Sequence, residues 1–369
     1  MQEELFLLLR LGLGTSKPDE EDLSRLSCLD EKQWQQLAKI SSIHGVAAIV
    51  FDGISNVVNY KGNKYLNHFD NQSFWSGLIA SWGVGIVEQQ YELGNKKQLA
   101  VIKDIQRRWS QAGIRMLLMK GMAMGTYYPI PYHRCPGDID CYLFDDYKKG
   151  NELAKSLNAV VDERWYKHSQ ILYMGQIIEN HQFFVHTRGG KKSKQLNNLL
   201  CSLLSGEDFN FLQDTNVLLP PPMFNAVFLS YHAQAHFLAE GLLLKQLVDW
   251  AMFLQKDQKR VDWDTFYEIC EIFHLRRFVD VSTDIAVHCL NVKPLSTLCT
   301  TSQYTQKVLE SALKDDDCIF SKPGGVWSKR LKLLSNLYKN RWKHHEIYQH
   351  SIIRQLWFYL VGFVFKTEE

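Results

Sequence analysis

The sequence predicts an α+β protein. A small α/β centre, residues 96–200, lies between a helical N-terminal region, residues 1–95, and a helical C-terminal region, residues 201–369. Apolar residues recur at spacings of three and four towards both ends of the chain, whereas short apolar runs bounded by Gly and Pro occupy the centre. These strand candidates are grouped and do not alternate with helices along the chain, which favours an α+β plan over a long βαβ alternation.

Composition and charge are those of an ordinary folded chain. Of the 369 residues, 46% are hydrophobic and 22% charged, and the net charge of +2 gives no global case for a protein that coats nucleic acid. The eight cysteines form no C-x-x-C pair, which argues against a thiolate zinc site. No secretory signal is evident, and the apolar run at 356–365 is shorter than the roughly 20 residues of a membrane span. We therefore expect a cytoplasmic protein without a transmembrane segment.

The expected elements follow one another in a simple order. The N-terminal region is mostly helical, with a helix start at SKPDEEDL in which Ser16 is the expected cap. The later elements are a buried strand in 112–121, a short helix after it, a loop to residue 137, a strand at 138–144, a surface helix in 145–160, strands at 169–175 and 176–186, a mobile basic loop at 189–194 and one long helix over 225–256.

The stretch RCPGDIDCYL, residues 134–143, places two aspartates at the head of an apolar strand, where Asp is normally depleted. Alternation along a strand puts Asp138 and Asp140 on one face, about 7 Å apart. Either the strand end is merely exposed, or the two carboxylates hold a cation that offsets their repulsion, and Mg²⁺ prefers such oxygen ligands. On the second hypothesis, Asp140→Asn should leave the metal-free chain as stable as the parent or more so.

A third acid, Glu179, lies in the later strand candidate IIENH. If it faces the same side as Asp138 and Asp140, the three carboxylates form a site for Mg²⁺ or Mn²⁺. Two such ions stabilise the attacking and leaving oxygens of an in-line phosphoryl transfer. Taken alone, Glu179 is equally consistent with an exposed position on a strand.

A phosphate-binding half is expected at Lys120 and Gly121. A strand that ends in Gly and turns into a helix lets backbone N–H groups approach phosphate closely, although Gly121 also suits a simple turn. Lys120 or Arg134 can neutralise phosphate charge, and Arg is the better bidentate partner.

Several histidines have both a functional and a structural interpretation. His181 follows Glu179 by two residues, so it contacts phosphate, orients an acid or makes a structural hydrogen bond. His232, His236 and Glu240 share one helix face at a spacing that can bind Zn²⁺, but no HExxH frame is present. Packing or lining of a substrate cleft is the main expectation for these three.

Two charged features lie further along the C-terminal region. Lys245 and Asp249 are spaced i, i+4 and are expected to form a surface pair. Residues 321–369 hold nine Lys or Arg and three Glu with interleaved Trp. Such a segment meets RNA, anionic lipid or an acidic partner, or is simply a solvated helix face.

The central motifs resemble a known family. LLMKGMAMGTYYPIPYHRCPGDIDCYLF followed by GQIIENH is similar to the uncharacterised bacterial nucleotidyltransferase family of the DNA polymerase beta superfamily, over roughly residues 112–182. The resemblance implies a polymerase-beta-like fold, a small mixed sheet with helices. It also implies Asp138, Asp140 and Glu179 as metal-binding carboxylates. Gly121 stands where the superfamily has its phosphate turn, but Met122 follows in place of the usual Ser or Gly.

The resemblance implies a metal-dependent nucleotidyltransferase that moves a nucleoside monophosphate from an NTP to an acceptor, which is a small molecule, a protein or an RNA. Lys120, Gly121 and Arg134 would hold the triphosphate. The alternative is a nucleotide-binding or regulatory protein without turnover, which Met122 favours. A third possibility is a module whose basic tail, residues 321–369, docks a polypeptide partner.

Overall fold

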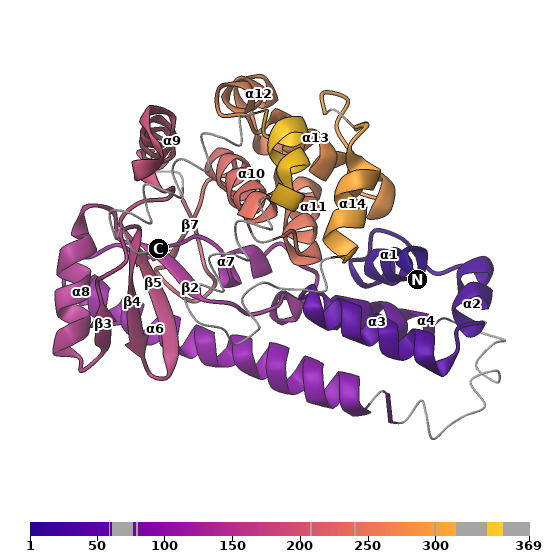
Figure 1. Ribbon diagram of the computed structural model, residues 1–369. Helices are drawn as coiled ribbons and strands as arrows, with labels where there is room; N and C mark the ends of the chain where they lie inside the picture. Colours follow the sequence, from indigo (N-terminus) through magenta and orange to yellow (C-terminus); the bar gives the residue numbers. More distant parts are fainter. Residues whose placement is uncertain are drawn as a thin grey trace.

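The computed structural model describes residues 1–58, 60, 77, 78, 80–206, 209–239, 241–298, 300–314 and 338–349. Within them a seven-stranded mixed sheet has the order β3-β4-β5-β2-β1-β7-β6 (Figure 1). The pairs β2–β5 and β1–β7 are parallel, and the other neighbours are antiparallel. The strands are β1 (Leu117–Leu118), β2 (Ile139–Tyr142), β3 (Val160–Asp162), β4 (His168–Tyr173), β5 (Gln176–His181), β6 (Asn210–Phe211) and β7 (Leu218–Leu219).

The two faces of this sheet differ in chemistry. Ile139 and Cys141 of β2, with Ile178 of β5, are buried in a core with the helices α6 (Leu93–Gln111) and α8 (Tyr147–Ser156). Because side chains alternate along a strand, Asp140 and Glu179 stand on the opposite face. That face therefore carries the polar groups of the central strands.

The expected α+β plan agrees with this helix-rich architecture around a small sheet. The strand candidates at 112–121, 138–144 and 176–186 each contain a strand of the structure, and the candidate at 169–175 overlaps β4, which begins one residue earlier. The sheet also takes β6 and β7 from beyond residue 200, so its strand content runs past the expected end of the central region. The domain boundaries themselves remain a prediction.

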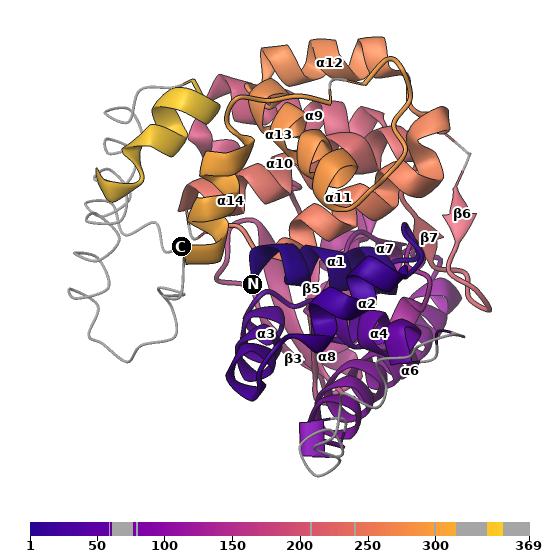
Figure 2. The same ribbon diagram turned by 90° about the vertical axis from the view of Figure 1, so that its right-hand side faces the viewer.

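The N-terminal helices form a compact group beside the sheet (Figures 1 and 2). Helices α1 and α4 cross so closely that a Cβ at Gly12 or Gly53 would collide with a backbone carbonyl of the other helix. Helix α2 begins after Asp19, whose side chain accepts a hydrogen bond from the Asp22 amide, so the cap expected at Ser16 was placed too early. The elements are α1 (Gln2–Gly12), α2 (Glu20–Ser27), α3 (Glu31–Ile43), α4 (Ala47–Val58) and the π-helical η2 (Ala80–Glu92).

The C-terminal helices pack against one another in a second group (Figure 2). The single long helix expected over 225–256 is wrong. One helix ends at Ala239 and the next begins at Leu244, and between them Gly241 has φ +120°, which is incompatible with an α-helix. The loop expected at 189–194 is also corrected, because α9 begins at Lys191. The helices are α9 (Lys191–Ser202), α10 (Pro222–Ala239), α11 (Leu244–Asp257), α12 (Trp263–Ile272), α13 (Arg276–Asp284) and α14 (Thr305–Lys314), with η7 (Ile285–Cys289) and η8 (Lys343–Ile347).

Some expectations fall on residues that the structure does not describe. These are Glu240, the apolar run 356–365 and, apart from 338–349, the basic segment 321–369. Among the residues that are described, no helix is both long enough and apolar enough to cross a membrane.

Candidate active site

The three predicted acids come together where β2 and β5 run side by side. Asp140 pairs in register with Glu179 across the two parallel strands, which places both side chains on one face of the sheet. Asp138 lies two residues earlier, just before β2 begins, and its carboxyl responds to the charges of both other acids. The structure therefore brings Asp138, Asp140 and Glu179 into one cluster.

Asp138 is the acid of this cluster that lacks a close counter-charge. Burial, and then the charges of Glu179 and Asp140, raise the pKa of its carboxyl above the ordinary value. Among the described residues, no Lys, Arg or His nitrogen lies within ion-pair distance of this carboxylate. An all-oxygen donor set with excess negative charge is the chemistry that suits Mg²⁺ or Mn²⁺.

Asp140, in contrast, is buried and fully compensated. Its Oδ1 lies 2.7 Å from Nζ of Lys120 and 3.0 Å from Nε2 of His181. Burial acts to raise the pKa of this carboxyl, but Lys120 and His181 hold it well below the ordinary value. These two partners argue against the expectation that Asp140→Asn leaves the metal-free chain as stable as the parent, because the substitution removes the charge that Lys120 and His181 contact.

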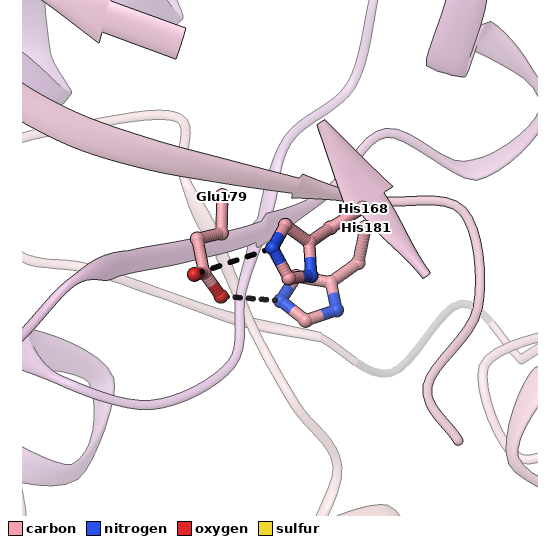
Figure 3. Close-up of side chains that lie close together, drawn as sticks. All are labelled: His168, Glu179 and His181. Atoms are coloured by element: carbon pink, nitrogen blue, oxygen red, sulfur yellow. Dashed lines mark ion pairs between the residues drawn. The ribbon is translucent and has the colours of Figure 1, made fainter. Parts of the chain in front are cut away.

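Glu179 faces the rings of His168 and His181, which lie next to each other (Figure 3). Its Oε1 is 3.4 Å from Nε2 of His168, and its Oε2 is 3.5 Å from Nε2 of His181. Burial acts to raise the pKa of the Glu179 carboxyl, but the nearby imidazoles of His181 and His168 lower it overall. Glu179 is therefore an ionised carboxylate near neutral pH.

Sequence reasoning missed His168, although a signal was present. Met174 and Gly175 both have positive φ, the conformation of a two-residue hairpin turn between β4 and β5. Such a turn pairs residues equidistant from it, which places His168 directly opposite His181. Counting outward from the Met-Gly turn would have predicted this pair.

Lys120 and Gly121 form the turn beside the acids, as expected. Gly121 has φ +56°, and a Cβ there would lie 3.3 Å from the carbonyl oxygen of Asp138, so glycine permits this approach. The turn leads into α7 (Met122–Gly125), which is a single helical turn. Gly121 therefore brings the chain close to the strand that carries the aspartates.

Helix α10 contributes a histidine to the same place. Nζ of Lys120 lies 3.1 Å from Nε2 of His232, which in turn lies 3.2 Å from Nε2 of His236. Burial, and then the charge of Lys120, lower the pKa of His232 well below the ordinary value. That His232 and His236 line a substrate cleft stays a prediction beside ordinary packing, and Glu240 lies outside the described residues.

Arg134 is placed differently from the acids. Its Nε and Nη2 donate to the two carboxylate oxygens of Asp249 at 2.9 and 2.8 Å, and Tyr128 donates to Asp249 at 2.7 Å. Both members of this pair are buried. The role of Arg134 in holding phosphate stays a prediction, and it would require this pair to open.

The surface pair expected between Lys245 and Asp249 is wrong, because Asp249 is buried and bonded to Arg134. Lys245 instead acts on Asp138, where its charge lowers the pKa of the carboxyl against the larger effects that raise it. Lys245 is thus a second cation near the acids that sequence reasoning assigned elsewhere.

Comparisons with known proteins add one finding. The model of a family described as an uncharacterised nucleotidyltransferase matches residues 87–291, which is more than half of the chain and includes every site residue described above. Neither the curated proteins nor the solved structures contain a match.

Proposed function

Because the chain belongs to this uncharacterised nucleotidyltransferase family, we propose that it transfers a nucleoside monophosphate from an NTP to an acceptor and releases pyrophosphate. The observation that carries the proposal is the register of Asp140 with Glu179 on one face of two adjacent parallel strands, with Asp138 just before the first of these strands. Three carboxylates in one cluster are costly unless a cation joins them. Lys120 compensates Asp140, so among the described residues Asp138 is the carboxylate that lacks a close cation, and we infer that a metal ion supplies it.

The three acids would hold Mg²⁺ or Mn²⁺, and the donor set fits such an ion since every ligand is an oxygen. Bound there, the ion would supply charge stabilisation for the transferring phosphoryl group and its leaving pyrophosphate. Asp138 supports this assignment most directly, because its pKa is raised by burial and by its two acidic neighbours.

Other groups of the chain have roles of their own in the proposal. The ammonium of Lys120 lies between Asp140 and His232, and from there it can donate a hydrogen bond to a phosphate oxygen. Lys245 adds positive charge beside Asp138. Because the pKa of Glu179 is lowered, this carboxylate is a weak base. We therefore assign Glu179 to accept a hydrogen bond from the acceptor hydroxyl and orient it.

The triphosphate would follow the turn at Lys120 and Gly121, where the absence of a side chain on Gly121 allows close approach. Arg134 would join only after release from Asp249. The buried Met122 follows Gly121 and offers no hydroxyl to phosphate. This feature favours the second candidate, a protein that binds nucleotide without turnover.

The test incubates the chain with each α-labelled NTP, Mg²⁺ and a cell extract, and measures both labelled products and released pyrophosphate. Label that moves to an acceptor supports the transferase, and sensitivity of the product to protease or nuclease identifies a protein or an RNA acceptor. Label that is bound but recovered as intact NTP supports the second candidate. A result equal to that of an Asp138→Asn, Asp140→Asn double variant overturns the transferase.

A further inference from the structure

The imidazoles of His168 and His181, beside the acids, offer nitrogen atoms with which a metal ion can be coordinated. His168, Glu179 and His181 offer one ligand atom each, and these atoms lie within 4.8 Å of one another (Figure 3). All three side chains stand on one face of the β4–β5 hairpin, where His168 and His181 are directly opposite each other. The geometry points to a binding site for a divalent transition-metal ion such as Mn²⁺, Fe²⁺, Co²⁺ or Zn²⁺, distinct from the oxygen-only site at Asp138.

The spacing of the ligand atoms fits a coordinated ion. Ligands about 2.1 Å from a tetrahedral ion lie about 3.4 Å from one another. Glu179 has one oxygen 3.4 Å from Nε2 of His168 and the other 3.5 Å from Nε2 of His181. These distances are long for a hydrogen bond between nitrogen and oxygen, for which 2.7–3.2 Å is usual.

The surroundings of His181 are those of a metal ligand. Its Nδ1 lies 3.3 Å from the carbonyl oxygen of Phe183, and its Nε2 lies on the side of the ring that faces the acids. Histidines that bind metal commonly donate their other ring N–H to a backbone carbonyl in this way. Nε2 of His181 also lies 3.0 Å from Oδ1 of Asp140.

His168 gives an independent indication. Both of its ring nitrogens are buried from solvent, and neither makes a hydrogen bond within the described part of the chain. A buried polar atom without a hydrogen bond is costly, and native structures rarely leave one unexplained. The ion-pair partner of Nε2, Glu179, lies 3.4 Å away, beyond the usual hydrogen-bond length. The ring of Trp165 stacks on that of His168, with 17° between their planes, and fixes its orientation. A bound ion would satisfy Nε2 of this preoriented ring.

The donor set selects the class of ion. Imidazole nitrogen suits Zn²⁺ and its first-row neighbours, whereas Mg²⁺ and Ca²⁺ take oxygen ligands. Three protein ligands leave further coordination positions open, as in metal sites that bind an exogenous group. Glu179 would thus stand between two positions of different chemistry, and metal binding at the histidines needs no nucleotide.

The test titrates Co²⁺ into the chelator-stripped full chain and follows heat release and visible absorption. We expect one Co²⁺ per chain with an absorption spectrum typical of nitrogen ligation, and millimolar Mg²⁺ should not displace it. His168→Gln and His181→Gln should each weaken Co²⁺ binding at least about tenfold. His288→Gln is the matched control, because His288 has a single acid, Asp284, at 3.6 Å and lies largely exposed.

Thermal unfolding of each variant without metal checks that it is folded, and the partly exposed His168 is the safer of the two sites to change. Co²⁺ binding that persists in both variants, or that occurs without nitrogen ligation, overturns the inference. A chain that binds Co²⁺ through these histidines but transfers no nucleotide contradicts only the proposed function. A chain that transfers nucleotide with Mg²⁺ but binds no Co²⁺ contradicts only this inference.

Discussion

Lys120 and Asp140 form an ion pair of 2.7 Å that joins the turn at Lys120 and Gly121 to strand β2. The pair compensates the charge of Asp140 and lowers the pKa of its carboxyl. The pKa of Asp138, in contrast, is raised by burial and by the charges of Glu179 and Asp140. The two carboxylates of the Asp-Ile-Asp motif therefore differ physically, although the sequence places them in equivalent strand positions. Substitutions at the two positions should have opposite effects on the metal-free chain.

Asp140→Asn should lower the free energy of unfolding of the metal-free chain by about 1.5–3 kcal/mol, the usual contribution of hydrogen bonds to charged groups. The reason is that Lys120 and His181 lose a charged partner. Asp138→Asn should leave stability unchanged or raise it, because it removes the carboxylate with the raised pKa. Denaturant unfolding of both variants in chelator measures the contrast. Equal losses of stability would mean that Asp138 is a structural hydrogen-bond acceptor.

Ligand-linked stability tests the oxygen-ligand site separately. The parent should gain about 2.7 kcal/mol from Mg²⁺ plus NTP at about 100 times the dissociation constant. Asp138→Asn should lose most of that gain while remaining folded. Unfolding with and without the ligands gives the result, and Asp162→Asn, at an exposed surface pair with Arg164, serves as the control. A full gain in Asp138→Asn would exclude that carboxylate as a ligand.

Glu179→Gln retains the size of the side chain and removes its charge. Transfer should fall at least ~100-fold, which corresponds to about 2.7 kcal/mol of barrier. Single-turnover measurements of nucleotide transfer at saturating NTP test this directly. A carboxylate moved to the neighbouring strand should not restore transfer. Gln170 is paired with Glu179 but lies on β4, on the side of β5 away from β2, so adding Gln170→Glu to Glu179→Gln should leave transfer low. If Glu179→Gln keeps activity within a few-fold of the parent, Glu179 is neither a metal ligand nor a group that orients the acceptor.

The part of the site that the sequence predicted depends on local signals. The Pro-Gly turn before Asp138, the alternation through β2 and the Gly at residue 121 are all properties of neighbouring residues. The contact between Asp140 and Glu179 followed from strand pairing on one face. Local pattern was enough to select these acids because each strand has one polar and one apolar face.

The remaining contacts join distant segments, and no local pattern specifies them. Lys120 meets His232 from 112 residues away, and Arg134 meets Asp249 from 115 residues away. Both contacts depend on how α10 and α11 pack on the central region, which is decided by the whole core. The expected pair of Lys245 with Asp249 is wrong for this reason. Asp249 binds the buried Arg134 from a distant segment and not Lys245 on its own helix.

The pair of Arg134 and Asp249 should be strongly stabilising relative to its half-removed forms. Arg134→Ala leaves a buried carboxylate without its cation, and losses of about 3–5 kcal/mol are typical of such a change. Arg134→Lys should also destabilise, since an ammonium cannot bond both oxygens of Asp249. Denaturant unfolding tests both, with Arg164→Ala at an exposed pair as a control that should show no measurable change. If Arg134→Ala unfolds like the parent but no longer binds NTP, the phosphate role is correct and the structural one is not.

His133 links the N-terminal helices to the central region in a pH-dependent way. It lies at the end of η3 (Pro131–His133), with Nδ1 2.7 Å from Asp52 of α4 and Nε2 3.3 Å from Glu92 of η2. Burial acts to lower the pKa of this imidazole, but Asp52 and Glu92 raise it above the ordinary value.

A histidine whose pKa is raised on folding contributes stability that is complete below its unfolded pKa, about 6.5, and is lost as pH rises through the folded pKa. The difference in free energy of unfolding between the parent and His133→Gln should therefore shrink as the pH rises above about 6.5. Urea unfolding of the two proteins across this range measures it, and His288→Gln, at a largely exposed site, should show no such trend. If the advantage of the parent instead grows with pH, His133 is buried as the neutral ring, and the ion pairs with Asp52 and Glu92 do not hold these segments together.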